Sequence, residues 1–309
     1  MSTTVGELWT LLPDGSWQAR DVNVQPWTGG KPSSANTGHS GTLTPVSGDQ
    51  IITVAGTVFE NKDVSGRIEV RAANVTIRNC RINGQGTGIR GWGLVNFLTA
   101  GSSGVVDRCT LEPADKSVLW EGIAGHHFTA RACDISGIVD GVGAKNVAAY
   151  SADLGVIVED CWIHGFYTAP DTYHSDGITH NDGIQIHTGG GVMIRRNFID
   201  ATDIDPESPQ TVAITSCVIV NGPVGQTWGT ITLEENWLSG AVSHFNGLGT
   251  NLAGYTLDAR GNLCSNKVSY EIAIASKYAA PGLPTTTGPD TTNGNVREST
   301  GGPITVHRT

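Results

Sequence analysis

The residues best suited to chemistry lie close together between positions 174 and 187. This stretch contains His174, Asp176, His180, Asp182, Gln185 and His187. Two carboxylates and a neutral imidazole can supply the acid and base that cleave, or eliminate at, a glycosidic bond. We therefore take Asp176, Asp182 and His187 as candidate catalytic residues. His174, His180 and Gln185 are candidate substrate-binding residues, because imidazole and amide groups suit sugar hydroxyls.

Other interpretations of this motif stay open. Asp176 and Asp182 each precede a glycine, and Asp-Gly is a common turn dipeptide in which the Asp side chain bonds its own backbone. The same carboxylates could hold Ca²⁺, although the motif requires no cofactor. The histidines lack the helical His-Glu-x-x-His spacing of zinc enzymes, so we predict no metal ligands.

The motif interrupts a repeat that runs through the chain. A short segment of alternating apolar and polar residues occurs seven times, and one position in each copy holds Cys80, Cys109, Cys133, Cys161, Asn197, Asn236 or Asn262. The intervals of 29, 24, 28, 36, 39 and 26 residues suit one structural unit per copy. Period-two alternation predicts strands with one buried face. Stacking about 4.8 Å apart would place these side chains in one column, so the cysteines are predicted to be reduced packing residues.

A second column lies two residues before the first. In order it holds Arg78, Asp107, Arg131, Glu159, Arg195, Glu234 and Arg260, so the sign of the charge alternates at every step. Like charges that face each other on neighbouring strands are destabilising, whereas opposite charges attract. The alternation favours stacking of consecutive copies in this register.

A third column, one residue after the first, contains Trp162, Phe198 and Trp237 in consecutive copies. Stacked aromatic rings would form a platform for sugars, so these three are further candidate substrate-binding residues. The alternatives are burial under a terminal segment of the chain and a subunit interface.

Composition excludes several classes of partner. The chain has 19 basic and 29 acidic residues and a net charge of −10, with no basic cluster for a phosphate backbone, so nucleic acid is not expected to bind. No apolar run is long enough for membrane insertion, and the N-terminus lacks the pattern of a signal peptide. We expect residues 1–41, which hold three tryptophans, to form an N-terminal cap or attachment segment. Residues 42–300 would form the solenoid, followed by a tail over 301–309.

Residues 75–82, 156–164, 180–185 and 192–200 resemble the pectin-lyase-like β-helix domains of actinobacterial exported proteins and of minor tail proteins of phages that infect these bacteria. Residues 295–301 resemble the last segment of that domain. The resemblance implies an all-β fold, a right-handed parallel β-helix. It also implies a minor tail or tailspike protein of the virion tail that contacts host cell-wall polysaccharide. Other tail proteins would be partners, and a homotrimer is one assembly to consider. The alternative is a polysaccharide lyase or glycoside hydrolase on the same scaffold.

Overall fold

The computed structural model describes residues 5–11, 17–23, 30–84, 92–147, 153–209, 214–221, 229–247, 256–265, 270–274, 288–289, 295–297, 299–300 and 302–308. Within these ranges there is no helix. Apart from a hairpin of β1 (Val5–Leu11) and β2 (Trp17–Asn23), the strands form three sheets. The described stretches therefore confirm the all-β prediction.

Sheet 1 contains β3 (Thr44–Ser47), β6 (Lys62–Ser65), β9 (Arg81–Ile82), β12 (Thr110–Leu111), β15 (Asp134–Ile135), β18 (Trp162–Ile163), β21 (Phe198–Ala201), β24 (Trp237–Gly240), β27 (Leu263–Cys264) and β30 (Val296–Arg297). Sheet 2 contains β4 (Gln50–Ile52), β7 (Ile68–Val70), β10 (Trp92–Phe97), β13 (Trp120–Gly125), β16 (Asp140–Ala144), β19 (Asp182–Ile186), β22 (Ser216–Val220), β25 (Ser243–Gly247), β28 (Tyr270–Ile274), β31 (Thr305–Arg308) and β29 (Gly288–Pro289). Sheet 3 contains β5 (Val58–Glu60), β8 (Val75–Arg78), β11 (Gly104–Asp107), β14 (Phe128–Arg131), β17 (Val156–Glu159), β20 (Val192–Arg195), β23 (Thr230–Glu234) and β26 (Thr256–Arg260).

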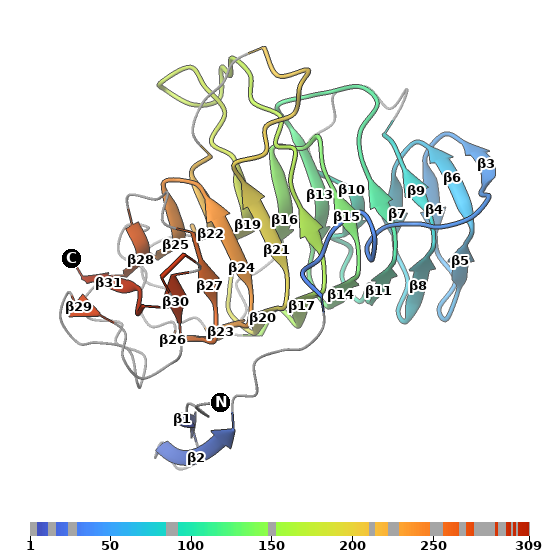
Figure 1. Cartoon of the computed structure of the whole chain (residues 1–309). Helices are drawn as coiled ribbons and strands as arrows, with labels where there is room; N and C mark the ends of the chain where they lie inside the picture. The colour runs from blue at the N-terminus through green and yellow to red at the C-terminus, as the bar shows by residue number, and fades with distance from the viewer. Residues whose placement is uncertain are drawn as a thin grey trace.

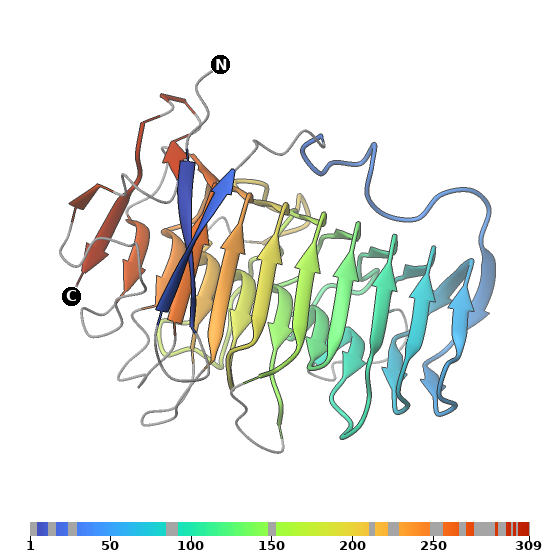
Figure 2. The ribbon, with the colours of Figure 1, turned by 90° about the horizontal axis from the view of Figure 1, so that it is seen from below.

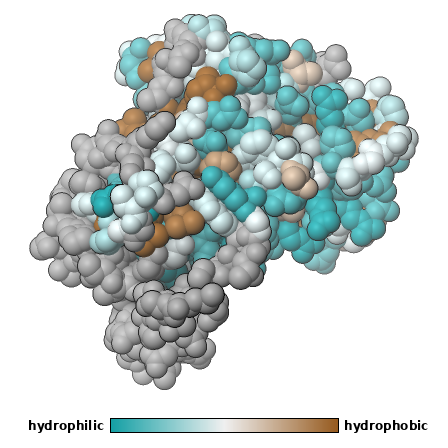
Figure 3. Space-filling model, viewed as in Figure 1, coloured by the Kyte–Doolittle hydropathy of each residue, from teal (hydrophilic) through white to brown (hydrophobic). Residues whose placement is uncertain are grey.

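From β3 to β28, strands pass from sheet 1 to sheet 2 to sheet 3 and then return to sheet 1 one coil further on (Figure 1). Neighbouring coils pair in parallel, for example β8 with β11 and β11 with β14. The chain is thus the right-handed parallel β-helix that the repeat predicted. The face seen in Figure 3 is mostly hydrophilic, with small scattered hydrophobic patches, because the apolar side chains fill the interior of the coils.

The Cys/Asn column is confirmed as a buried ladder. All six cysteines are buried thiols outside any disulfide, and the backbone N–H of Cys133 points to Cys161 Sγ at 3.4 Å. In the later coils each amide donates to the next, so that Asn197 Nδ2 bonds Asn236 Oδ1 at 3.0 Å and Asn236 Nδ2 bonds Asn262 Oδ1 at 2.9 Å. Asn295 continues this ladder by one coil. Hydrogen bonding satisfies polar groups that would otherwise be costly to bury.

The alternating charges also lie in register. Asp107 pairs with Arg131, Glu159 with Arg195, and Glu234 with Arg260 on adjacent strands of sheet 3. Ion pairs join each of these, at 3.0, 2.6 and 3.4 Å. The sequence therefore predicted both the strands and their stacking register.

Before β3, residues 30–43 form a side strap along the outside of the solenoid (Figure 2). Gly38 donates its backbone N–H to Ala132, His39 bonds Thr110 Oγ1 at 2.8 Å, and Ser40 donates to Asn79 Oδ1. The described strap therefore packs along the side of the coils and not over the first coil. In that first coil, Val54 remains 67% exposed.

Candidate functional site

An open pocket of about 330 Å³ lies on the outer face of sheet 2, over β13, β16, β19 and β22. It is lined by Val118, Leu119, Trp120, Glu121, Val139, Asp140, His174, His180, Asp182, Gln185, Thr215, Ile219 and Asn221. The loop before β13 and the loop before β19 form its walls, and strands of sheet 2 form its floor. The pocket therefore combines apolar side chains with carboxyl, imidazole and amide groups.

Three acidic residues occupy equivalent positions in successive coils of this floor. Glu121 on β13 is in register with Asp140 on β16, which is in register with Asp182 on β19. The next position in this column is Ser216 on β22. Strand spacing of about 4.8 Å makes these residues direct neighbours.

A glycine after each acid explains why the acids face outward. A Cβ at Gly141 would lie 2.5 Å from Ile163 Cγ2, and one at Gly183 would lie 2.5 Å from Ile199 Cγ2. These positions therefore face the core and have no room for a side chain. The residue that follows each glycine, Val142 or Ile184, is also buried. Two consecutive inward positions break the period-two alternation, and this local bend places the preceding carboxylate in the pocket.

The neighbouring carboxyls change each other's acidity. Burial, followed by the charge of Glu121, raises the pKa of Asp140 to about 8. Burial and the charge of Asp140 raise the pKa of Asp182 well above its usual range. Desolvation and a nearby like charge both disfavour the ionised form, so the Asp140–Asp182 pair retains a proton at neutral pH.

Lys145 forms a close ion pair with Glu121 Oε1 beside these acids. Three buried oxygens of the column, Glu121 Oε2, Asp182 Oδ1 and Ser216 Oγ, have no hydrogen-bond partner among the described residues. Such atoms are uncommon in folded proteins. Glu121 and Asp182 line the pocket, whereas Ser216 is buried behind it, so the first two leave hydrogen-bonding capacity for a ligand.

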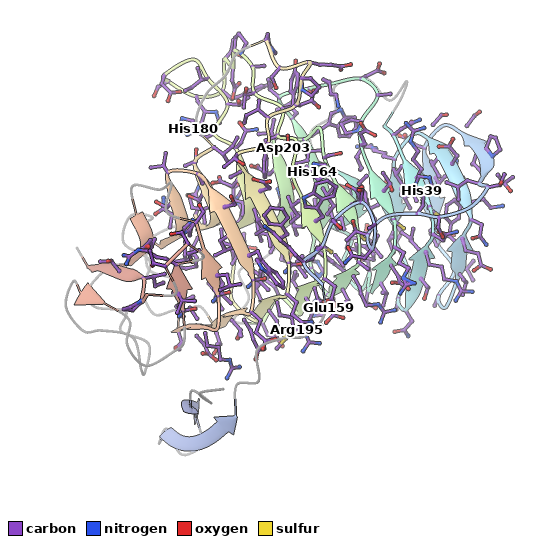
Figure 4. All side chains as sticks on the ribbon, viewed as in Figure 1. His39, Glu159, His164, His180, Arg195 and Asp203 are labelled. Carbon is purple, nitrogen blue, oxygen red and sulfur yellow. The ribbon has the colours of Figure 1, made fainter. Side chains whose placement is uncertain are left out.

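Two histidines form part of the pocket wall, in the loop before β19 (His180 is labelled in Figure 4). The rings of His174 and His180 stack with centroids 4.1 Å apart. Asp171 bonds His174 Nδ1 at 2.6 Å, and Asp176 bonds His180 Nε2 at 2.7 Å. Each carboxylate fixes the orientation of its imidazole.

The structure brings together four of the residues that the sequence selected. His174, His180, Asp182 and Gln185 all line the pocket. Asp176 reaches the pocket only through His180, and its side chain also accepts the N–H of Ile178 within its own turn. Asp176 thus forms the turn bond expected of an Asp-Gly dipeptide, whereas Asp182 lies in the pocket lining.

His187 projects from the end of β19 and does not line the pocket. Burial, together with the charge of Lys145, lowers its pKa to about 3, so its ring is neutral at physiological pH. Its backbone N–H donates to Ala144 in the adjacent coil.

The aromatic column lies on sheet 1 and is separate from the pocket. Trp162, Phe198 and Trp237 are in register there and half-buried. The rings of Trp162 and His164 stack with their centroids 3.4 Å apart. The Nζ atom of Lys31, in the side strap, lies 3.6 Å from the centre of the Phe198 ring. A terminal segment of the chain, one of the alternatives considered for this column, thus contacts it.

His164 joins three coils at this second surface. Its Nε2 bonds Asp134 and its Nδ1 bonds Asp203, both at 2.9 Å, and Figure 4 shows His164 beside Asp203. Burial alone would lower the pKa of His164, but the two carboxylates outweigh burial and raise it.

No cluster of three or more His, Cys, Asp or Glu side chains that could hold a metal ion occurs in the described ranges. In those same ranges, no helix is long and apolar enough to cross a membrane.

Sequence reasoning missed Glu121, Asp140 and Lys145. A signal for the two acids was present: Glu121-Gly-Ile, Asp140-Gly-Val and Asp182-Gly-Ile repeat an acid, a glycine and a β-branched residue. Because the loops between them differ in length, their spacings of 19 and 42 residues conceal the equivalence.

Comparison of the chain with protein-family models, curated proteins and solved structures finds no match.

Proposed function

We propose that the chain binds a cell-surface polysaccharide in the sheet 2 pocket, as a minor tail or tailspike type of virion protein. The observation that carries the proposal is the composition of the pocket, in which Val118, Leu119 and Ile219 lie beside carboxyl, imidazole and amide groups. Apolar side chains can cover the carbon face of a sugar, and the polar groups can bond its hydroxyls. The assignment to a virion rests on the family resemblance of the repeat.

The length of the solenoid supports a polymeric ligand. The outer face of sheet 2 continues from β13 to β25 without a change of strand direction, so several sugar units can lie across successive coils. Each neutral hydrogen bond between a sugar hydroxyl and the protein contributes about 0.5–1.5 kcal/mol to the free energy of binding.

Cleavage of the bound glycan is a second candidate function, favoured by the proton that the Asp140–Asp182 pair holds at neutral pH. A protonated carboxyl can donate to a leaving glycosidic oxygen, and a nearby carboxylate such as Glu121 can act as base or nucleophile. This pair of a carboxyl acid and a carboxylate would serve a hydrolase. A lyase would instead need a base, such as the His180 imidazole, to remove a proton from the sugar ring.

Incubation of the protein with purified actinobacterial cell-wall glycans tests both candidates. Binding without product supports a receptor-binding role, new reducing ends without unsaturated ends indicate a hydrolase, and unsaturated ends indicate a lyase. Gln185→Ala and His180→Ala are expected to weaken binding severalfold, whereas Trp237→Ala, on sheet 1, is expected to leave it unchanged. Sensitivity to Trp237→Ala alone would move the binding surface to sheet 1.

A further inference from the structure

The acid column within the pocket suggests which glycans it selects, an inference that rests on the proposed glycan-binding function. Asp140, Asp182 and Ser216 follow one another in register on β16, β19 and β22. Asp182 is only 1% exposed, and its Oδ1 and the Ser216 Oγ lack partners among the described residues. Asp140 and Asp182 line a pocket that is open to solvent, and Ser216 is buried next to Asp182 in the column.

Little positive charge balances this column within the described structure. Among the described residues, Lys145 forms an ion pair with Glu121, and its charge also reaches Asp140, where it favours the ionised carboxyl. Asp182 takes part in no ion pair among the described residues. Among the described residues, the Asp140–Asp182 end of the column therefore has acceptor oxygens and no direct ion pair, and the proton that the pair holds at neutral pH limits the repulsion between the two carboxyls.

We propose that this end of the pocket binds the ammonium group of an amino sugar within the glycan. An ammonium carries three N–H donors and no acceptor, which matches the carboxyl oxygens of Asp140 and Asp182, the two residues of this end that line the pocket. Its positive charge also relieves the repulsion between the two carboxylates. A sugar hydroxyl supplies no charge, and an acetamido group replaces the charge with a bulkier neutral group.

A thermodynamic signature follows from the proton held by the carboxyl pair. An ammonium that enters the pocket replaces this proton. At about pH 5.5 the sugar amine and the carboxyl pair are both protonated, so binding there releases protons to the buffer. The affinity should rise between about pH 5 and pH 6, where competition from protons weakens while the sugar amine stays charged. A neutral glycan in the same pocket would displace no proton and would show little dependence on pH.

Isothermal titration calorimetry with the full chain tests the proposal. The probes are the β-1,4-linked tetramer of glucosamine and its fully N-acetylated counterpart, each measured in two buffers of different ionisation enthalpy. We expect the free amine tetramer to bind at least tenfold more tightly and to release protons. Asp182→Asn should remove most of this preference, and Asp140→Asn provides a second variant should the first fold poorly. Gln185→Ala, outside the column, should weaken both probes to a similar extent.

Three outcomes would overturn the proposal: equal or tighter binding of the acetylated tetramer, binding without proton release, and amine binding that survives both Asp variants. The last would indicate attraction to the overall negative charge. If neither tetramer binds but a cell-wall glycan does so through Gln185 and His180, the amino-sugar inference fails and the glycan-binding function stands. If no glycan binds, both fail.

Discussion

Asp182 donates its backbone N–H to Asp140 Oδ1 at 2.9 Å, so that one acid of the pocket supports the other across adjacent coils. The bond favours an ionised Asp140, yet burial and Glu121 raise the pKa of this carboxyl to about 8. Desolvation and repulsion therefore exceed the gain from one hydrogen bond. The pocket retains a strained charge arrangement that is useful for binding a cation or for donating a proton.

This balance predicts a pH-dependent stability difference for Asp140→Asn. Unfolded Asp has a pKa of about 3.9, so the folded protein binds more protons than the unfolded chain between about pH 4 and pH 8. The contribution of the Asp140 carboxyl to the free energy of unfolding of the wild type therefore falls as the pH rises through that window. Each pKa unit corresponds to about 1.4 kcal/mol. Urea unfolding should show Asp140→Asn gaining stability relative to wild type from pH 4 to pH 8; a constant difference would mean that the carboxyl is ionised throughout.

The glycine bend supplies a second prediction. In Gly141→Ala the new methyl group would lie 2.4 Å from the carbonyl oxygen of Gly183 and 2.5 Å from Ile163 Cγ2. Overpacking of this kind typically costs about 1–3 kcal/mol, and the displaced strand should also weaken glycan binding. Gly30→Ala is the matched control, since its nearest neighbour would be 3.8 Å away. Equal stability of the two variants in urea would show that the bend tolerates a side chain.

The ladder and the charge column could be predicted from sequence because each places one residue type at one position of a short strand. Cys133 and Asn236 lie in segments with the same alternation, so their equivalence does not depend on loop length. The strands of sheet 3 and the short strands of sheet 1 that follow them are joined by tight turns, which keeps the register constant from coil to coil.

The pocket could be predicted only in part. Asp182 and Gln185 were recognised because they belong to one dense motif, but Asp140 reaches them from another coil through a loop of different length. The aromatic column was correctly assembled around Trp162. The column lies on sheet 1 and the pocket on sheet 2. The alternation of apolar and polar residues predicts strands, but it does not predict which sheet carries the long loops that form the pocket.

A third prediction concerns the transition from Cys to Asn in the ladder. Asn236→Leu would leave the backbone N–H and Nδ2 of Asn197, both bonded to Asn236 Oδ1, without that acceptor. Each buried unsatisfied group costs about 1–3 kcal/mol, so a loss of several kcal/mol is expected. Cys161→Asn, which only extends the amide ladder, should change stability by less than about 1 kcal/mol. Similar losses in both variants by urea unfolding would contradict the ladder interpretation.

A fourth prediction addresses the charge column. Glu159 is bonded by Arg195 and Arg196 and is only 8% exposed. Glu159→Lys should cost about 1–3 kcal/mol, because it removes the acidic partner of Arg195 and places a third cation beside Arg195 and Arg196. Reversal of Arg131, Glu159 and Arg195 together should cost less than the sum of the single reversals. Strict additivity would indicate that the three residues do not interact.

The last prediction concerns His164, which joins Asp134 and Asp203 across three coils. Its pKa is raised in the folded protein: burial opposes the charged form, but the bonds to both carboxylates favour it more strongly. The folded state therefore binds more protons than the unfolded chain above pH 6.5, the usual value for histidine. The stabilisation is complete below that pH and is lost as pH rises through the folded pKa. Unfolding of wild type and His164→Gln, compared from pH 5 to pH 9, should give the largest difference at the acid end. Asp203→Asn should reduce this pH dependence by removing one of the two partners. A difference that grows with pH would mean that His164 is neutral in the folded protein and that its bonds to the carboxylates do not depend on an imidazolium.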